Sequence, residues 1–164
     1  MVAPVLVGHY HCIFFPLYYN PACLHWTDRL LGWIATAEKN THMLIDERFS
    51  GNIVELSEGC SKVELVTTTE MTVDETGLIH GGFIFSVADY AAMVAVNHPF
   101  VVLGSANVKF LKPVRAGEPI EAVAVVTSEE GKKREVTVDV TRDGDVVFHG
   151  DFTCIVPAKH VLGE

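Results

Sequence analysis

Hydrophobic and polar positions alternate along the chain from residue 53 onward, and one long apolar stretch interrupts the alternation. Residues 53–56 and 60–68 predict two strands around a turn at residues 57–59. The apolar stretch, residues 78–96, opens with two glycines and is rich in alanine, which predicts a helix. Further strands are predicted at residues 101–111, 120–127, 135–141 and 146–156, with turns at residues 129–132 and 143–144.

The order of these elements is a hairpin, one apolar helix and an antiparallel meander. A helix that is apolar nearly all round must be buried on most of its sides. A curved antiparallel β-sheet wrapped around one long central α-helix satisfies that requirement. The sequence therefore predicts an α+β protein with the hotdog fold.

The amino-terminal residues differ in composition from the rest of the chain. Residues 1–27 contain no Asp, Glu, Lys or Arg, and four proline or glycine positions interrupt them. These interruptions and the missing positive charge fit neither a membrane helix nor a secretory signal. We expect residues 1–42 to be an appendage, or sequence upstream of a start at Met43, and residues 43–164 to form the domain.

The four cysteines, Cys12, Cys23, Cys60 and Cys154, match no zinc template and no CxxC motif. The histidines and cysteines near the start of the chain fit no standard metal site either. We interpret the cysteines as free thiols of a cytoplasmic protein and expect no metal and no cofactor.

The charge is acidic overall, with 12 Lys and Arg against 21 Asp and Glu and a formal net charge of −9. Such a surface argues against nucleic acid as a partner, because phosphate neutralisation needs basic residues. Seven basic residues nevertheless fall within one 34-residue stretch, which is either an anion-binding patch or a set of solvated strand faces. They are Lys109, Lys112, Arg115, Lys132, Lys133, Arg134 and Arg142.

Asp89 is the most informative single residue, because it is the only charged residue between Thr76 and Lys109. Burial of an unpaired carboxylate costs several kcal/mol or raises its pKa. A carboxylate in the middle of an apolar helix therefore indicates a functional group. The alternative is a structural aspartate that hydrogen-bonds the backbone, a role better suited to a helix end.

His80, Gly81 and Gly82 stand at the predicted start of the helix. Free N–H groups and the positive end of the helix dipole suit a developing oxyanion, although the glycines could simply form a tight turn. Gly81 and Asp89 are eight residues apart, about 12 Å along a helix. A two-fold dimer with antiparallel helices would bring the glycines of one chain to the aspartate of the other.

The run from His80 to Asp89 closely resembles the signature of hotdog thioesterases of the phenylacetic-acid-degradation type. The resemblance extends over roughly residues 45–156 and includes the segments 107–113 and 116–118. It implies an acyl-CoA thioesterase in which Gly81 supplies an oxyanion N–H and Asp89 is the nucleophile or general base. His80 would orient the glycine loop, and the active form would be a homodimer or homotetramer.

Two positions depart from that pattern. An amide residue is common about six positions before the histidine, whereas this chain has Asp74 and Glu75 there. Some relatives carry a Ser or Thr at the start of the strand after the helix, and Ser105 lies nearby. We take Asp74 and Ser105, with Lys109 and Lys112, as candidate substrate-binding residues.

Other functions find less support in the sequence. No nucleophile elbow, P-loop or dinucleotide fingerprint is present. An Asn20–Pro21 pair followed by His25 resembles a hydratase motif only loosely and precedes the predicted fold. The serious alternative is a non-catalytic hotdog domain that binds acyl-CoA and regulates transcription; a purely structural dimer module is a third reading.

Overall fold

The computed structural model describes residues 37–163, which form one six-stranded antiparallel sheet and a long helix. The strand order is β1-β2-β4-β5-β6-β3, so β1 and β3 lie at the two edges. Two one-turn helices, α1 and η2, flank the first hairpin. The elements are α1 (Glu47–Ser50), β1 (Asn52–Ser57), β2 (Cys60–Val66), η2 (Thr69–Met71), α2 (Gly81–Val96), β3 (Val102–Phe110), β4 (Pro119–Glu130), β5 (Lys133–Arg142) and β6 (Asp145–Ile155).

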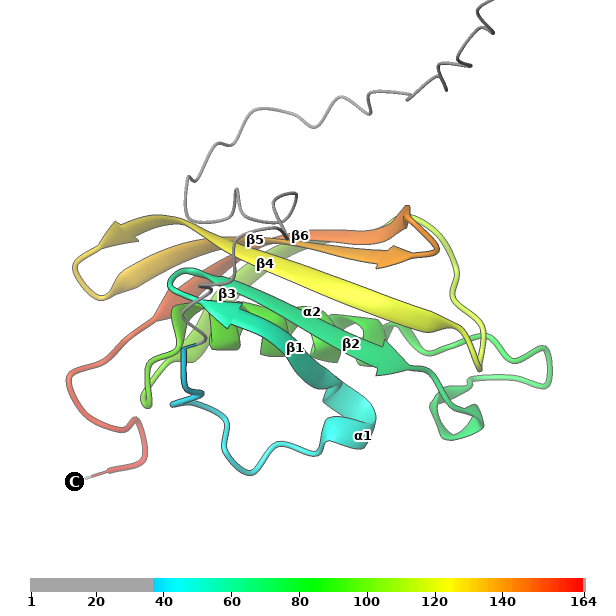
Figure 1. The fold of residues 1–164 in the computed structure, drawn as a ribbon, viewed down its shortest axis with the longest axis horizontal. Helices are drawn as coiled ribbons and strands as arrows, with labels where there is room; N and C mark the ends of the chain where they lie inside the picture. Colours follow the sequence, from blue (N-terminus) through cyan, green and yellow to red (C-terminus); the bar gives the residue numbers. More distant parts are fainter. Residues whose placement is uncertain (1–36, 164) are drawn as a thin grey trace, which may run out of the picture.

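The sheet curves over α2, which packs mainly against β2, β4 and β5 (Figure 1). Nine of the 16 residues of α2 are buried, so the helix is enclosed on most sides as its composition requires. In β5, Val136, Val138 and Val140 are buried and alternate with partly exposed residues, which gives the sheet one apolar inner face. The predicted hotdog architecture is confirmed.

The predicted elements are confirmed apart from their ends. The helix begins at Gly81 and not at Leu78, because Leu78 and Ile79 form extended bridges with Arg115 and Thr72. Strands β4 and β5 extend further into their hairpin than predicted, leaving a turn at residues 131–132. The short helices α1 and η2 were not predicted, since a single turn produces no hydrophobic periodicity.

The described residues just before Met43 contact the domain. The Lys39 ammonium donates to the Tyr90 hydroxyl at 3.3 Å, and Asn97 bridges Glu38 and Asn40 with its side-chain amide. Asn97 is also the left-handed C-cap residue of α2. Residues 37–42 thus contact the domain, and the rest of the appendage predicted for residues 1–42 lies outside the described residues.

Cys154 is a free and buried thiol, as expected. The expectation does not hold for Cys60, which is disulfide-bonded. The other two cysteines precede the described residues. Within residues 37–163, no helix has the length and apolar character needed to cross a membrane, and no cluster of metal-ligating side chains occurs.

Candidate active site

The start of α2 is built around the side chain of His80. Its backbone is extended, and its Nδ1 accepts a hydrogen bond from the Gly82 N–H at 2.8 Å, which caps the helix. A Cβ on Gly82 would lie 2.7 Å from that nitrogen, so a larger residue would displace the imidazole. The histidine and the second glycine are thus required together by local geometry.

Gly81, the first residue of α2, keeps its N–H free. The N–H of Gly82 donates to His80 Nδ1 and that of Phe83 to the His80 carbonyl, whereas the Gly81 N–H has no partner in the described part of the chain. A free N–H at the positive end of a helix attracts a negatively charged oxygen. A Cβ at Gly81 would lie 3.0 Å from the Phe110 ring, so glycine also permits close packing there.

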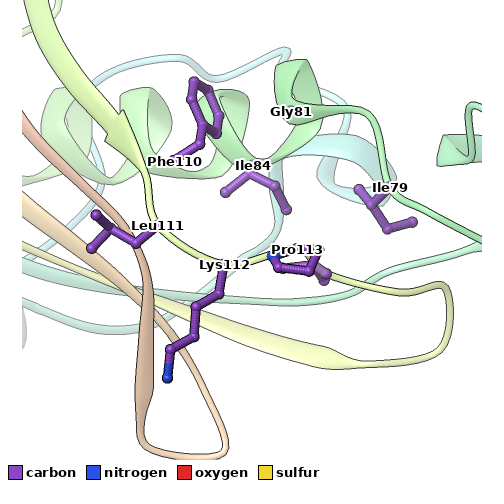
Figure 2. Close-up of a pocket in the computed structure, with 8 residues that line it drawn as sticks. Ile79, Gly81, Ile84, Phe110, Leu111, Lys112 and Pro113 are labelled. Carbon is purple, nitrogen blue, oxygen red and sulfur yellow. The ribbon is translucent and has the colours of Figure 1, made fainter.

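A groove of about 320 Å³ lies beside Gly81 (Figure 2). Apart from Lys112, its lining residues have apolar side chains or none, but polar atoms contribute about half of its surface; the groove joins the start of α2 to the segment that follows β3. Phe110 is 55% exposed although its ring packs edge-on against the buried Phe148, at 5.2 Å between centroids. The lining residues are Ile79, Gly81, Ile84, Phe110, Leu111, Lys112, Pro113 and Val114.

Asp89 lies two turns further along α2 and is half-buried. Its Oδ1 is the one buried side-chain oxygen or nitrogen without a hydrogen-bond partner among the residues described. Burial raises the pKa of the Asp89 carboxyl to about 6. The carboxylate is therefore ionised at pH 7 and is a stronger base than an exposed aspartate.

The Asp89 side chain lies on the side of α2 that faces β6. Phe85, one turn earlier on the same helix face, stacks on Phe152 of β6 at 5.7 Å between centroids. The negative charge of Asp89 also contributes, after burial, to raising the pKa of the Cys154 thiol to about 12. Beyond β6 the sheet ends at the edge strand β3.

Asp74 is engaged by its own loop. Its Oδ1 accepts hydrogen bonds from the Thr76 hydroxyl at 2.7 Å and the Thr76 N–H at 2.9 Å. These bonds, the hydroxyl's foremost, lower the pKa of the Asp74 carboxyl. In the described chain Asp74 stabilises the turn that precedes the helix, and a contact with substrate stays a prediction.

Ser105 and Lys109 lie on the outer face of the sheet. They pair with Thr153 and His149 of β6, whereas Val108 and Phe110 alternate with them and pair with Gly150 and Phe148 on the inner face. The helix, Gly81 and Asp89 are on that inner face. Within one chain, Ser105 and Lys109 are therefore separated from the groove by the sheet.

Lys112 lines the groove but its ammonium points away from Gly81, toward the β5–β6 turn (Figure 2). There it forms an ion pair with Asp145 at 2.8 Å. Three more of the basic residues singled out in the sequence form ion pairs: Lys133 with Glu135, Arg134 with Glu129, and Arg142 with Glu118. The Arg115 guanidinium donates to the Thr76 carbonyl at 3.2 Å. These contacts favour solvated, ion-paired strand faces over a preformed cationic patch.

The groove itself was missed by reasoning from the sequence. The groove is lined mainly by Phe110, Ile79 and Ile84. Nothing in the local sequence around these residues distinguishes them from residues of the hydrophobic core. The one sequence feature that could have indicated the groove is the segment 107–113, which contains Phe110. It entered the sequence analysis only as part of the family resemblance.

Comparison with known proteins identifies the chain's relatives. Residues 76–149 match the thioesterase superfamily, a region that includes His80, Gly81, Asp89 and Phe110. The chain is 48% identical to a structure of an uncharacterised protein from Pyrococcus horikoshii, covering 79% of this chain and all of that one with a TM-score of 0.78. The chain belongs to the thioesterase superfamily.

Members of the superfamily with PaaI-type names are structurally similar as well. A mutant of the phenylacetic acid degradation protein PaaI from Thermus thermophilus is 26% identical and has a TM-score of 0.62; the match covers 68% of this chain and 96% of that one. The resemblance to the phenylacetic-acid-degradation type is thereby confirmed.

The present chain is also similar to two curated proteins whose names indicate other functions. It is 52% identical over 112 residues to a methylthioribose-1-phosphate isomerase of Aquifex aeolicus, of which the match covers 25%. It is 29% identical over 113 residues to the transcription factor FapR of Caldanaerobacter subterraneus, of which the match covers 56%. Each match covers 68% of this chain, so the chain spans a quarter to about half of these relatives' length.

Proposed function

We propose that this chain is an acyl-CoA thioesterase that hydrolyses a thioester to a free acid and CoA. The observation that carries the proposal is the presence on one helix of two groups that have no hydrogen-bond partner among the described residues. They are the Gly81 N–H, which lies beside the groove, and Oδ1 of the Asp89 carboxylate. Thioester hydrolysis needs both kinds of group, one for the developing oxyanion and one to supply an oxygen nucleophile.

Two routes are open to Asp89. Its carboxylate can attack the thioester carbonyl, so that the C–S bond breaks, CoA leaves as thiolate and water then hydrolyses the mixed anhydride. Alternatively, it can take a proton from a water molecule that attacks the same carbon. In both routes the carbonyl oxygen becomes negative, and the Gly81 N–H with the helix dipole would stabilise it.

The two groups would act across a dimer. Eight helical residues separate Gly81 from Asp89 by about 12 Å, too far for one carbonyl group to contact both. The edge strand β3 supports this arrangement, because four consecutive residues, Gly104–Asn107, are exposed and β6 is its one partner among the described strands. Since Asp89 lies on the side of α2 toward β6, a second chain paired at β3 would approach it.

We accordingly expect the protein to sediment as a dimer or a pair of dimers at micromolar concentration. Analytical ultracentrifugation measures this directly. A monomer that still hydrolyses thioesters at that concentration would contradict the shared site.

Activity should depend on the ionised form of Asp89. Its pKa of about 6 lies above the usual value of 3.8, so the carboxyl is mostly protonated and inactive below pH 6. We expect kcat/KM to rise about tenfold per pH unit on the acid side and to level off above pH 6 to 7. A profile that is flat between pH 4.5 and 8 would remove Asp89 from the chemistry.

A second function is favoured by the FapR relatives, which are named transcription factors. In that case the chain would bind an acyl-CoA as a regulatory ligand without hydrolysing it. Release of free thiol from a panel of acyl-CoAs, measured beside acyl-CoA binding by calorimetry, separates the two functions. Turnover supports the hydrolase, whereas tight binding without thiol release supports the regulator. CoA phosphate contacts of Lys109 or Lys112 stay predictions.

A further inference from the structure

A compact network holds together the two chain segments that form the groove beside Gly81. It comprises Thr67 at the end of β2, Glu118 before β4 and Arg142 at the end of β5. None of these residues lines the groove. Thr67 and Arg142 contact the loop of residues 113–118 that continues from its wall, and Glu118 is the last residue of that loop.

Glu118 and Arg142 fix the loop from one side. The Glu118 Oε2 accepts hydrogen bonds from the Arg115 N–H at 2.7 Å and from Arg142 Nη1 at 3.0 Å. The same guanidinium nitrogen donates to the Pro113 carbonyl at 2.8 Å. These two side chains are only 21% and 30% exposed, for Arg142 and Glu118 respectively, so their ion pair is partly shielded from solvent.

Thr67 fixes the loop from the other side. Its hydroxyl lies 2.8 Å from the Arg115 carbonyl oxygen and 2.9 Å from that of Glu118, and its backbone exchanges hydrogen bonds with Gly117 and Glu118. Thr67 is only 1% exposed. The loop is therefore held by hydrogen bonds from residues at the ends of β2 and β5, the strands on either side of β4.

The loop in turn contacts residues 77–79, which lead into α2. The Ile79 N–H donates to the Val114 carbonyl at 2.9 Å, the Ala116 N–H donates to the Gly77 carbonyl at 2.9 Å, and Leu78 bridges Arg115. Ile79 is followed by the cap residue His80 and then by Gly81. The Glu118–Arg142 ion pair thus holds the loop, and the loop holds the residues that place the Gly81 N–H.

The geometry points to Glu118 and Arg142 as positioning residues for the Gly81 N–H and the adjacent groove wall. This inference rests on the proposed thioesterase function and adds a role that neither residue would have from its own chemistry. Neither side chain touches the groove, so they act through the loop. A displacement of about 1 Å at a reacting group is enough to cost up to 100-fold in rate.

The test compares Glu118→Ala, the near-isosteric Glu118→Gln and Arg142→Ala with a matched control. Glu129→Ala is that control, because it removes another ion pair, with Arg134, near the opposite end of β5. For each dimeric full-length protein, kcat and KM are measured with the best acyl-CoA of the panel, and hydrogen exchange is measured at the Ile79 amide by NMR.

We expect about a tenfold fall in kcat for Glu118→Ala and Arg142→Ala, with a smaller change in KM and faster exchange at Ile79. The kcat of Glu118→Gln should lie between those of wild type and Glu118→Ala. The kcat of the double alanine variant should be only slightly below that of either single variant, since the two residues form one unit. Glu129→Ala should match wild type in every measurement.

Unchanged kcat in folded Glu118→Gln and Arg142→Ala proteins would overturn the inference, whether or not exchange at Ile79 changes. A fall in kcat with unchanged exchange at Ile79 would overturn the proposed route through the loop while leaving the thioesterase function intact. If the wild-type protein releases no thiol, the proposed function fails first, and the positioning role falls with it.

Discussion

Asp89→Asn should lower kcat for acyl-CoA hydrolysis by about 100-fold or more, the scale expected when a general base is lost. The substitution keeps the size and shape of the side chain and removes the charge that both routes need. Substrate binding should persist, because the groove beside Gly81 is unaltered. Steady-state release of free thiol at pH 7.5, with calorimetry for acyl-CoA affinity, measures the two effects separately.

Loss of activity in this variant should not come from loss of folding. The Asp89 carboxyl is protonated in folded and unfolded states below pH 3.8, whereas above pH 6 the folded chain carries a buried charge. A pKa raised from 3.8 to about 6 corresponds to a cost of about 3 kcal/mol at pH 8, an upper bound for this half-buried group. Asp89→Asn should therefore unfold at the same temperature as wild type, or higher, at pH 8.

Asp151→Asn is the matched control. Asp151 lies on β6 and its carboxylate accepts a hydrogen bond from Thr137, on the outer face of the sheet. The same chemical change there should leave kcat within about twofold of wild type, a surface substitution being nearly neutral. If Asp89→Asn retains most of the wild-type kcat, Asp89 is not the catalytic group.

Gly81→Pro should lower kcat by about 100-fold to 1000-fold, the range for loss of one oxyanion donor. Proline removes the N–H and is well suited to the first residue of a helix. The preceding residue, His80, has φ −63 and ψ 128, a conformation that proline tolerates in its predecessor. The variant should keep its helix content by circular dichroism.

Gly81→Ala separates the missing N–H from the added carbon. Its Cβ would meet the Phe110 ring at 3.0 Å, as the Cβ of proline would, but its N–H remains. Because Phe110 is half-exposed, its ring can shift slightly, and we expect a loss below tenfold. Equal losses in the two variants would mean that crowding, and not the N–H, explains the effect.

The sequence was sufficient to predict the fold and the location of Gly81 and Asp89 on one helix, whereas their catalytic roles stay predictions. Asp89 was evident because a single charge in an apolar helix is costly, and the glycines after His80 because their location predicts a helix start. The geometry adds the reason for the local motif: His80 occupies the Gly82 N–H and leaves that of Gly81 free.

Side-chain orientation on the strands was not predictable. Leu103 and Ser105 flank an irregularity in the pairing of β3 with β6, so alternation could not be counted across it to place Ser105. The inner or outer face of Lys109 depended on the same register. The groove depends on contacts between Phe110 and Gly81, 29 positions apart, which only the packing of β3 beside α2 brings together.

Residues 37–42 were included in the predicted appendage for a related reason. The contacts of Lys39 and Asn40 with Tyr90 and Asn97 are polar, and polar contacts with distant residues leave no hydrophobic pattern in the sequence. The same holds for Glu118 and Arg142, whose hydrogen bonds join segments far apart along the chain.

Mixing the two inactive variants tests the shared site most directly. Asp89→Asn and Gly81→Pro chains, unfolded together and refolded at equal amounts, should form mixed dimers in which one site carries both substitutions and the other carries neither. Random pairing predicts recovery of about a quarter of wild-type thioesterase activity, while each variant refolded alone stays near its own residual rate. Mixed dimers, identified by mass spectrometry, that recover no activity would contradict a site built from Gly81 of one chain and Asp89 of the other.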